Sequence, residues 1–316
     1  MKQILLMIAV VAIGQSVLAA DKKPLTKEES AKVIEAAIRK SLKKPTGELT
    51  KADYEKVKRL DLNNKGITDI SALAELKELE VLNIHSNRIS DLNPLVELSK
   101  LVHLELYENQ ITDLKPLGRL NSLKILWLTE NPKIKDYSPI AGIRGQLESY
   151  SSGRNGIANL DVLGIAQMTS LKVLYLHENQ LTSVKGLENL DQLTSLYLDG
   201  NKLTDVKGLE KLTQLEVLNL SFNRLTEVPK ELEKLTQLTG LRLSENQLTS
   251  VKGLEKLTKL KDLRLPNNRL TSVKGLEKLT KLTFLLLANN PALTQAQIDE
   301  LQKALPNCTI HSNPKK

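Results

Sequence analysis

Apolar residues recur along this 316-residue chain in one pattern that repeats about every 22 residues. A unit such as LYLDGNKLTDVKGLEKLTQL, residues 196–215, begins with two leucines that alternate with polar residues. An alternation with a period of two predicts a short β-strand with one buried face. After the asparagine, apolar residues fall at every third position from Leu203 to Leu215. That spacing favours a 3₁₀ or extended return path, because an α-helix has a period near 3.6.

An asparagine ends the predicted strand in nearly every unit. It recurs, mostly 22 residues apart, at Asn87, Asn109, Asn131, Asn179, Asn201, Asn223, Asn246, Asn268 and Asn290. Asn155 divides the longer gap between residues 131 and 179 into two units of 24 residues. An upstream copy at residues 60–67 has Lys65 in this place and brings the number of units to eleven. The asparagine amide can bond backbone groups of neighbouring turns that would otherwise be buried without a partner.

No single unit can enclose a core of its own, so the units must stack. We therefore predict an α/β solenoid, a curved horseshoe with a parallel sheet on its concave side. Short 3₁₀ or irregular segments are expected on its convex side. The eleven repeats are assigned to residues 60–293, between an N-terminal helical cap at 20–59 and a C-terminal helical cap at 294–316.

The two caps are predicted from helix-start signals. Thr26 with Glu29, and Thr294 with Gln297, have the spacing of a capping box, which begins a helix. A further helical start is expected at Thr50, directly before the first repeat. These helices would cover the exposed edges of the first and last repeats.

The consensus LxxLxxLxLxxNxIxxIxxL is that of a leucine-rich repeat. Stretches such as NRISDLNPLVELSKL (87–101) and NQITDLKPLGRLNSL (109–123) resemble the internalin-type subclass of bacterial surface proteins. The resemblance covers residues 60–293 and implies a binding protein, although this scaffold carries many different binding roles. We find no immunoglobulin-like module and no cell-wall sorting motif in the sequence, so we do not expect the internalins' surface anchoring or host-cell adhesion.

The first residues have the pattern of a secretory signal peptide. Lys2 precedes an apolar run over residues 4–13, and a small-residue cleavage site follows, with cleavage expected after Ala19. The run is too short to span a bilayer comfortably. An uncleaved anchor and a structural segment are the alternatives. We expect an exported protein, in the periplasm or outside the cell, with no stable membrane insertion after cleavage.

Counting back from each asparagine shows which side chains face the concave surface. Residues five and three positions before it point into the core, while those six, four and two positions before it point out, with the preceding residue at the rim. The large, scarce residue types gather at these outward positions. They are His85, His103, Tyr107, Trp127, Tyr175, His177, Tyr197 and Phe222, which include the only tryptophan of the chain.

Aromatic side chains supply much of the binding energy at protein surfaces. We therefore predict that Tyr107, Trp127, Tyr175, Tyr197 and Phe222 anchor a partner on the concave face. The three histidines would tune the contact and make it change near pH 6. The alternative is that these large side chains merely cover the sheet.

Charge favours a protein partner over nucleic acid. The chain carries a net +8, but its outward columns hold four arginines against eight carboxylates. Nucleic-acid binding would need a basic stripe interleaved with aromatics, and this face is acidic. Glu105, Glu108, Glu130 and Glu178 are expected to select a partner with basic groups. The basic excess lies in the VKGLEKLT return segments, most simply as a solvated face, with attraction to anionic envelope surfaces as the alternative.

The fifth unit departs from the consensus. In SYSSGRN, residues 149–155, Tyr150 and Ser152 replace the leucines, and the outward residues are small. Two interpretations stay open at this point. The small residues leave a recess between Trp127 and Tyr175, or the unit is a decayed repeat with a local bulge.

Catalytic chemistry finds little support. His177 and Asp199 are neighbours with Ser221 next in the column, but a flat sheet offers no oxyanion hole or closed cleft. The only cysteine, Cys308, is expected in a last half-strand of the C-terminal cap, and it allows no intramolecular disulfide. We predict a monomeric, non-enzymatic protein without metal or cofactor that binds a protein. The alternatives are a carbohydrate binder that uses the same aromatics and a structural envelope protein without a specific ligand.

Overall fold

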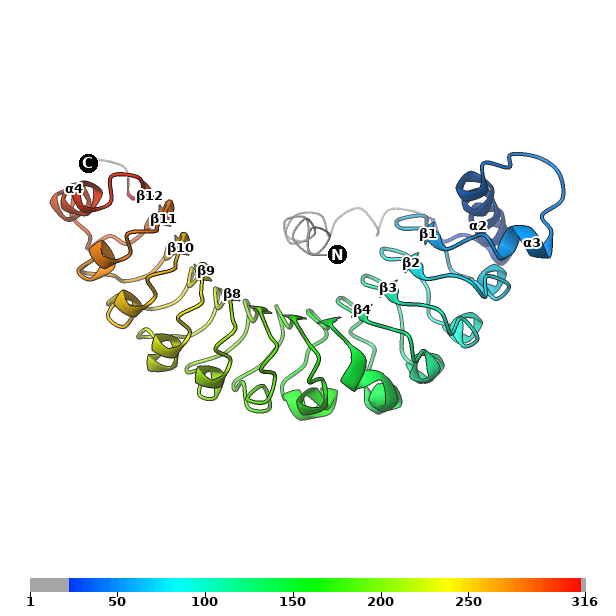
Figure 1. Ribbon diagram of the computed structural model, residues 1–316, viewed down its shortest axis with the longest axis horizontal. Helices are drawn as coiled ribbons and strands as arrows, with labels where there is room; N and C mark the ends of the chain where they lie inside the picture. The colour runs from blue at the N-terminus through cyan, green and yellow to red at the C-terminus, as the bar shows by residue number, and fades with distance from the viewer. Residues whose placement is uncertain (1–22, 314–316) are drawn as a thin grey trace.

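Twelve short strands lie side by side along the inner edge of a curved coil in the computed structural model, which describes residues 23–313 (Figure 1). The strands pair in sequence order, β1 to β12, and every pair is parallel. The return segments form the outer edge of the arc. The predicted leucine-rich repeat horseshoe is thus confirmed. The expected signal peptide lies outside the described residues.

Each strand has three residues. They are β1 (Arg59–Asp61), β2 (Val81–Asn83), β3 (His103–Glu105), β4 (Ile125–Trp127), β5 (Ser149–Ser151), β6 (Val173–Tyr175), β7 (Ser195–Tyr197), β8 (Val217–Asn219), β9 (Gly240–Arg242), β10 (Asp262–Arg264), β11 (Phe284–Leu286) and β12 (Thr309–His311).

Within residues 23–313, three α-helices lie at the ends of the coil, and short 3₁₀ helices follow most of the strands. The α-helices are α2 (Lys27–Leu42), α3 (Lys51–Tyr54) and α4 (Gln295–Ala304). The 3₁₀ helices are η1 (Ser71–Leu73), η2 (Asn93–Leu95), η3 (Lys115–Arg119), η4 (Ser138–Gln146), η5 (Leu160–Leu163), η6 (Ile165–Gln167), η7 (Leu209–Lys211), η8 (Lys230–Lys234), η9 (Leu254–Lys256) and η10 (Leu276–Lys278). The period-three prediction of 3₁₀ return segments is therefore confirmed.

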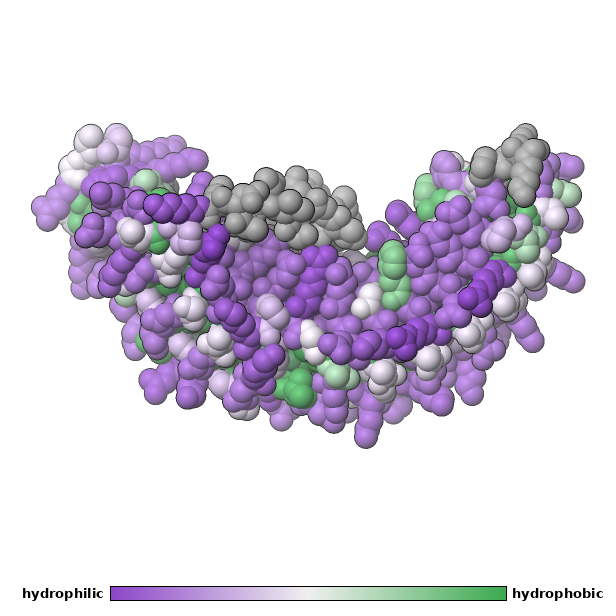
Figure 2. Space-filling view, turned by 180° about the vertical axis from the view of Figure 1, so that it is seen from behind, coloured by the Kyte–Doolittle hydropathy of each residue, from purple (hydrophilic) through white to green (hydrophobic). Residues whose placement is uncertain are grey.

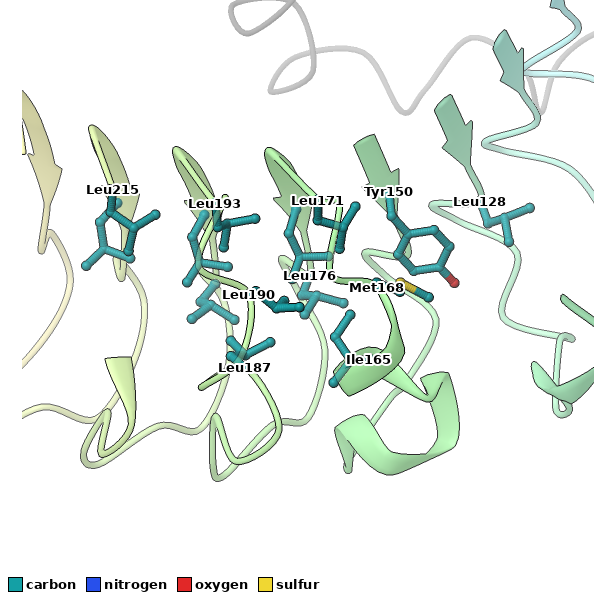
Figure 3. Packing of buried hydrophobic residues seen from close by; sticks show 14 of the residues in the cluster. Leu128, Tyr150, Ile165, Met168, Leu171, Leu176, Leu187, Leu190, Leu193 and Leu215 are labelled. Carbon is teal, nitrogen blue, oxygen red and sulfur yellow. The ribbon is translucent and has the colours of Figure 1, made fainter. Parts of the chain in front are cut away.

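The core is one continuous file of aliphatic side chains. The middle residues of adjacent strands are paired in register, as Leu174 is with Leu196 and Leu196 with Leu218. All three are fully buried. Figure 3 shows leucines of successive coils packing against one another between the strands and the return segments. Each buried leucine contributes about 1.5–3 kcal/mol, and that contribution exists only because the neighbouring coil covers it.

A ladder of buried asparagines joins each coil to the next. Asn201 Nδ2 donates to Leu198 O of its own strand end and to Leu176 O of the preceding coil, both at 3.0 Å. Its Oδ1 accepts from the backbone N–H of Leu181 at 3.0 Å. Equivalent bonds recur at other repeat asparagines, such as Asn223. In the irregular fifth unit Asn155 Nδ2 donates to Leu128 O of the preceding coil at 3.0 Å, but its own-coil acceptor is Ser152 Oγ, and its Oδ1 accepts from Asn131 N. The predicted role of the asparagine is confirmed.

Both ends of the coil carry the expected helices. The capping boxes at Thr26 and Thr294 are present, and α3 begins after Thr50 as predicted. Ile34 and Ile38 of α2 are buried in the core beside the first repeat. At the other end β12 pairs with β11, which confirms the expected last half-strand, although Cys308 lies one residue before it and not within it.

The fifth unit keeps the fold by exchanging its leucines for a polar arrangement. Tyr150 is fully buried and points into the core near Met168 (Figure 3). Tyr137 Oη lies 3.2 Å from both Ser152 Oγ and Asn155 Nδ2. The hydroxyl of Tyr137 therefore forms hydrogen bonds with Ser152 and Asn155 at a place where the other coils have packed leucines.

The asparagine ladder predicts a strong local effect on stability. Replacing Asn201 by alanine removes the partners of buried backbone groups in two coils, and each such group costs about 1–3 kcal/mol. We expect the free energy of unfolding of Asn201→Ala to fall by at least about 2 kcal/mol, measured by urea denaturation. The exposed Thr204→Ala in the same repeat is the control and should change it by less than about 0.5 kcal/mol. Equal effects of the two substitutions would contradict the role of the ladder.

Candidate binding surface

The strand register places the outward residues in straight columns. The column four positions before the asparagines runs Asn83, Glu105, Trp127, Ser151, Tyr175 and Tyr197 from β2 to β7. Adjacent members of a column lie one strand spacing apart, about 4.8 Å. The predicted column is therefore present, and it brings side chains from six different repeats together on the concave side.

The rim of the sheet is a column of left-handed residues. The residue before each repeat asparagine has a positive φ, between 49° and 58° for the nine non-glycine members, and Asn64 before Lys65 of the first unit has φ 52°. Only Gly200 in this column is a glycine, with φ 69°. This backbone turn lets the asparagine point inward, while the rim N–H bonds the next coil, as Glu108 N does with Thr129 O at 2.9 Å. This column was not predicted from the sequence. Asn64, Gly200, Asn267 and Asn289 are of types that favour left-handed geometry, but the Glu, Arg, Ser and Phe members are not.

Six rings form a continuous aromatic ladder over strands β2 to β7. Its members are His85, His103, Tyr107, Trp127, Tyr175 and Tyr197, all of them half-buried. Their contacts pair His85 with Tyr107 (ring centroids 3.9 Å apart, stacked), Tyr107 with Trp127 (6.4 Å), His103 with Trp127 (5.9 Å), Trp127 with Tyr175 (6.0 Å) and Tyr175 with Tyr197 (4.6 Å, stacked). The structure thus joins the ring-bearing residues that the sequence singled out, apart from His177 and Phe222.

The small residues of β5 do not leave a recess between Trp127 and Tyr175. The two rings meet edge-on across the strand, and Trp127 Nε1 donates to Ser149 Oγ at 3.0 Å. The ring of His177 covers Gly153 so closely that a Cβ there would lie 2.5–2.8 Å from it. The small residues of the fifth unit therefore make room for large side chains of its neighbours. This arrangement replaces the two earlier interpretations, a recess between the rings and a decayed repeat with a local bulge.

Several carboxylates of the face are already paired. Arg154 donates to Glu130 at 2.8 Å and to Glu178 at 2.7 Å. Glu105, only 9% exposed, lies 2.8 Å from His103 Nε2. The expected selection of basic partners by Glu105 and Glu130 would therefore compete with pairs inside the protein.

Glu108 accepts from Ser86 Oγ at 2.6 Å, and burial together with the neighbouring Glu130 raises the pKa of its carboxyl.

Burial lowers the pKa of both His85 and His177 below the usual value. The His85 ring is stacked on Tyr107, and His177 is packed over Gly153. A switch near pH 6 was expected from these histidines, and for these two the protonation step lies below the usual imidazole value of about 6.5. The physical reason is desolvation, which disfavours the charged imidazolium.

The His177, Asp199 and Ser221 neighbours do not form a catalytic arrangement. Asp199 Oδ1 accepts from Asn219 Nδ2 at 2.8 Å, and burial raises the pKa of the Asp199 carboxyl. Among residues 23–313, no group of three His, Cys, Asp or Glu side chains is placed to hold a metal ion. In the same part of the chain, no helix has the length and apolarity needed to cross a bilayer.

Phe222 stands apart from the ladder, at the rim beside β8. Its side chain is 58% exposed, although its backbone has φ 56°. A left-handed conformation costs a non-glycine residue about 1–2 kcal/mol, and a bulky residue there is an outlier. An exposed aromatic held at this cost, on the rim of the concave face, is a candidate partner contact.

Comparisons with known proteins agree with this architecture. The family model for leucine-rich repeats (2 copies) matches residues 55–97, 99–142, 169–211, 191–235 and 213–256. The chain belongs to the leucine-rich repeat family, and its 22-residue repeats are of the internalin type. A comparison with curated proteins finds no significant match.

Three solved structures illustrate the likeness. An internalin (InlF) from Listeria monocytogenes is 28% identical, covers 90% of both chains and has a TM-score of 0.73. The functional domain of InlJ from the same organism, which includes a cysteine ladder, is 22% identical over 88% of this chain and 68% of its own, with a TM-score of 0.66. The plant peptide hormone receptor RGFR1, in complex with RGF2, is 22% identical over 84% of this chain and 49% of its own, with a TM-score of 0.57. The last two show the fold alone.

The left-handed backbone of Phe222 predicts that an asparagine in its place makes the protein more stable. Asparagine tolerates left-handed geometry, so Phe222→Asn should raise the free energy of unfolding by about 0.5–1 kcal/mol. Thermal and urea denaturation measure this change. A loss of stability of more than about 1 kcal/mol would show instead that the ring is held for packing.

The buried histidines predict a pH dependence with a definite sign. Their folded pKa values lie below the unfolded value of about 6.5, so the unfolded chain binds protons more readily. Their contribution to stability is complete above that pH and is lost as the pH falls through it. NMR titration should find His85 and His177 protonating below pH 6.5, with assignments from His85→Gln and His177→Gln. Titration of either at or above pH 6.5 would contradict their desolvation.

Proposed function

We propose that this chain is an exported, non-enzymatic protein that binds a protein partner through the concave side of its repeats. In this proposal residues 60–293 form the binding scaffold, and the segments 20–59 and 294–316 cap its ends. The observation that carries the proposal is the aromatic ladder, a continuous set of half-buried rings from six residues on the concave face.

The ladder is suited to binding because its rings are already ordered. Tyr175 and Tyr197 stack on each other, and Trp127 is fixed by its bond to Ser149. A ring that is held in place loses little conformational entropy when a partner covers it. Tyr and Trp in such positions often carry a large share of binding energy. Phe222 would extend the contact to the rim.

The acidic groups around the ladder favour a partner with basic side chains. Asp61 is exposed, and Glu178 remains exposed although Arg154 contacts it. A partner arginine or lysine could compete with Arg154 for Glu130 and Glu178. The plant receptor of the same fold is in complex with RGF2, so a protein or peptide ligand is compatible with such a coil.

Glycan binding is the second candidate. None of the aromatic contacts that Trp127 makes within residues 23–313 is stacked, since its neighbours approach at 44°, 63° and 73°. An indole without a stacked neighbour could accept a sugar ring on its face. This candidate shares the surface but differs in the partner that is captured.

Affinity capture from the envelope and secreted fractions of the native organism tests the proposal. The baits are the chain without residues 1–19, its Trp127→Ala/Tyr197→Ala variant, and a control variant Lys207→Ala/Lys211→Ala on the convex side. We expect a partner that the wild type and the control retain and the aromatic variant loses by at least about tenfold, equivalent to about 1.4 kcal/mol.

All three baits must show the same thermal stability for the comparison to count. Retention of a protein by the wild type and the control alone supports the proposal, and retention of a glycan in that pattern replaces it by the second candidate. Equal capture by all three baits, or no capture by any, argues against a concave aromatic binding site.

A further inference from the structure

The charge of the coil is strongly segregated along the chain. Residues 246–293 contain nine Lys and Arg against three Asp and Glu, a net +6, whereas residues 60–245 contain 20 against 25, a net −5. Six exposed lysines of the return segments hold most of the excess, and we call them the convex lysine surface. They are Lys252, Lys256, Lys259, Lys274, Lys278 and Lys281.

The nearby carboxylates neutralise these lysines only in part. Asp262 is paired with Arg264 at 2.9 Å. Glu255 and Glu277 accept from the backbone N–H groups of Gly253 and Gly275, at 2.7 Å and 2.6 Å. Within residues 23–313, the one ion pair made by the convex lysine surface joins Lys256 to Glu233.

A groove of about 360 Å³ lies between two adjacent coils at the centre of this surface. Lys252, Lys274 and Lys278 line it together with Ser250 and Ser272. Each serine Oγ accepts the backbone N–H two residues on, at 3.1 Å, which leaves its hydroxyl hydrogen for a further acceptor. Glu255 and Glu277 also line the groove, each with one oxygen bonded to a glycine N–H. The groove therefore presents three ammonium groups and two hydroxyls beside two carboxylates, which leaves it with a net positive charge.

The same scaffold elsewhere lacks this charge. Residues 181–223 carry lysines at the matching places, yet they contain four basic against six acidic residues. Asp205 stands where Ser250 lies in the later copy, and Glu216 stands where Lys261 lies. The excess of positive charge is thus a property of the last repeats. The VKGLEKLT pattern alone does not produce it.

We propose that the convex lysine surface binds a flexible, linear polymer of phosphate groups that carries no bases. Regularly spaced ammonium groups with hydroxyl donors suit repeated phosphates. The surface lies on the outside of the arc, where exposed side chains are predominantly hydrophilic (Figure 2). A planar bilayer would touch this convex edge along a line only, whereas a flexible chain can follow it.

Nucleic acid fits the surface less well. Single-stranded nucleic acids are held by aromatic stacking as well as charge, and residues 246–283 contain no Phe, Trp or Tyr. The binding is independent of the concave aromatic ladder, so either proposal can fail without the other.

Titration of the full chain with long-chain inorganic polyphosphate, followed by calorimetry, tests this inference. We expect binding at low salt, with log K falling against log salt by about 0.7 for each phosphate contact. Lys252→Glu/Lys274→Glu/Lys278→Glu should weaken the binding by about tenfold or more. The matched control, Lys185→Glu/Lys207→Glu/Lys211→Glu, makes the same charge change in the same pattern and should stay within about twofold.

Equal weakening by the two triple variants would overturn the proposal, because net charge alone would then explain the binding. Absence of polyphosphate binding at low salt would overturn it as well. Anionic phospholipid vesicles or single-stranded DNA that bind as tightly, with the same loss in the first variant, would assign the surface to a membrane or a nucleic acid instead. Thermal unfolding checks that both triple variants are folded, and the corresponding Lys→Gln triples replace them if either is not.

Discussion

The buried asparagine that ends each strand is the interaction on which this structure depends. Its amide is bonded to one carbonyl of its own coil and to one carbonyl and one N–H of the preceding coil, as Asn201 shows. These backbone groups lie where the chain turns from strand to return path, so neither sheet nor helix hydrogen bonds could satisfy them. The ladder therefore fixes the distance and register between coils, while the leucines supply the burial energy.

The same ladder determines what the concave face presents. Holding the asparagine inward forces the preceding residue into left-handed geometry and projects it at the rim, which is how Phe222 comes to be exposed. Holding the strands in register brings rings from successive repeats into contact, from His85 to Tyr197. One repeated backbone therefore carries two different surfaces. Its inner face is rigid, aromatic and acidic, and its outer face is basic at the C-terminal end.

The repeat pattern predicted the sheet, the asparagine bonds, the 3₁₀ return segments and the helix starts, because each follows from local periodicity or capping. It also predicted the column that holds Trp127 and Tyr175. It did not predict that these rings meet across β5, since the rotamers depend on the small side chains of Ser149 and Ser151 and not on spacing. The left-handed rim was missed because most of its residues, such as Glu108 and Phe222, have no local preference for it, and the few Gly and Asn members did not form a pattern on their own. The lowered pKa values of His85 and His177 were missed because burial by neighbouring rings cannot be read from one strand.

Trp127 is the only indole of the chain, so its fluorescence reports on the aromatic ladder alone. The most direct test of the central claim is acrylamide quenching of Trp127 in the free protein and in its complex with a captured partner. The concave-face account predicts that saturation with the partner protects the half-buried indole and lowers the quenching constant clearly. An unchanged quenching constant at saturation would place the partner elsewhere on the coil and contradict the account.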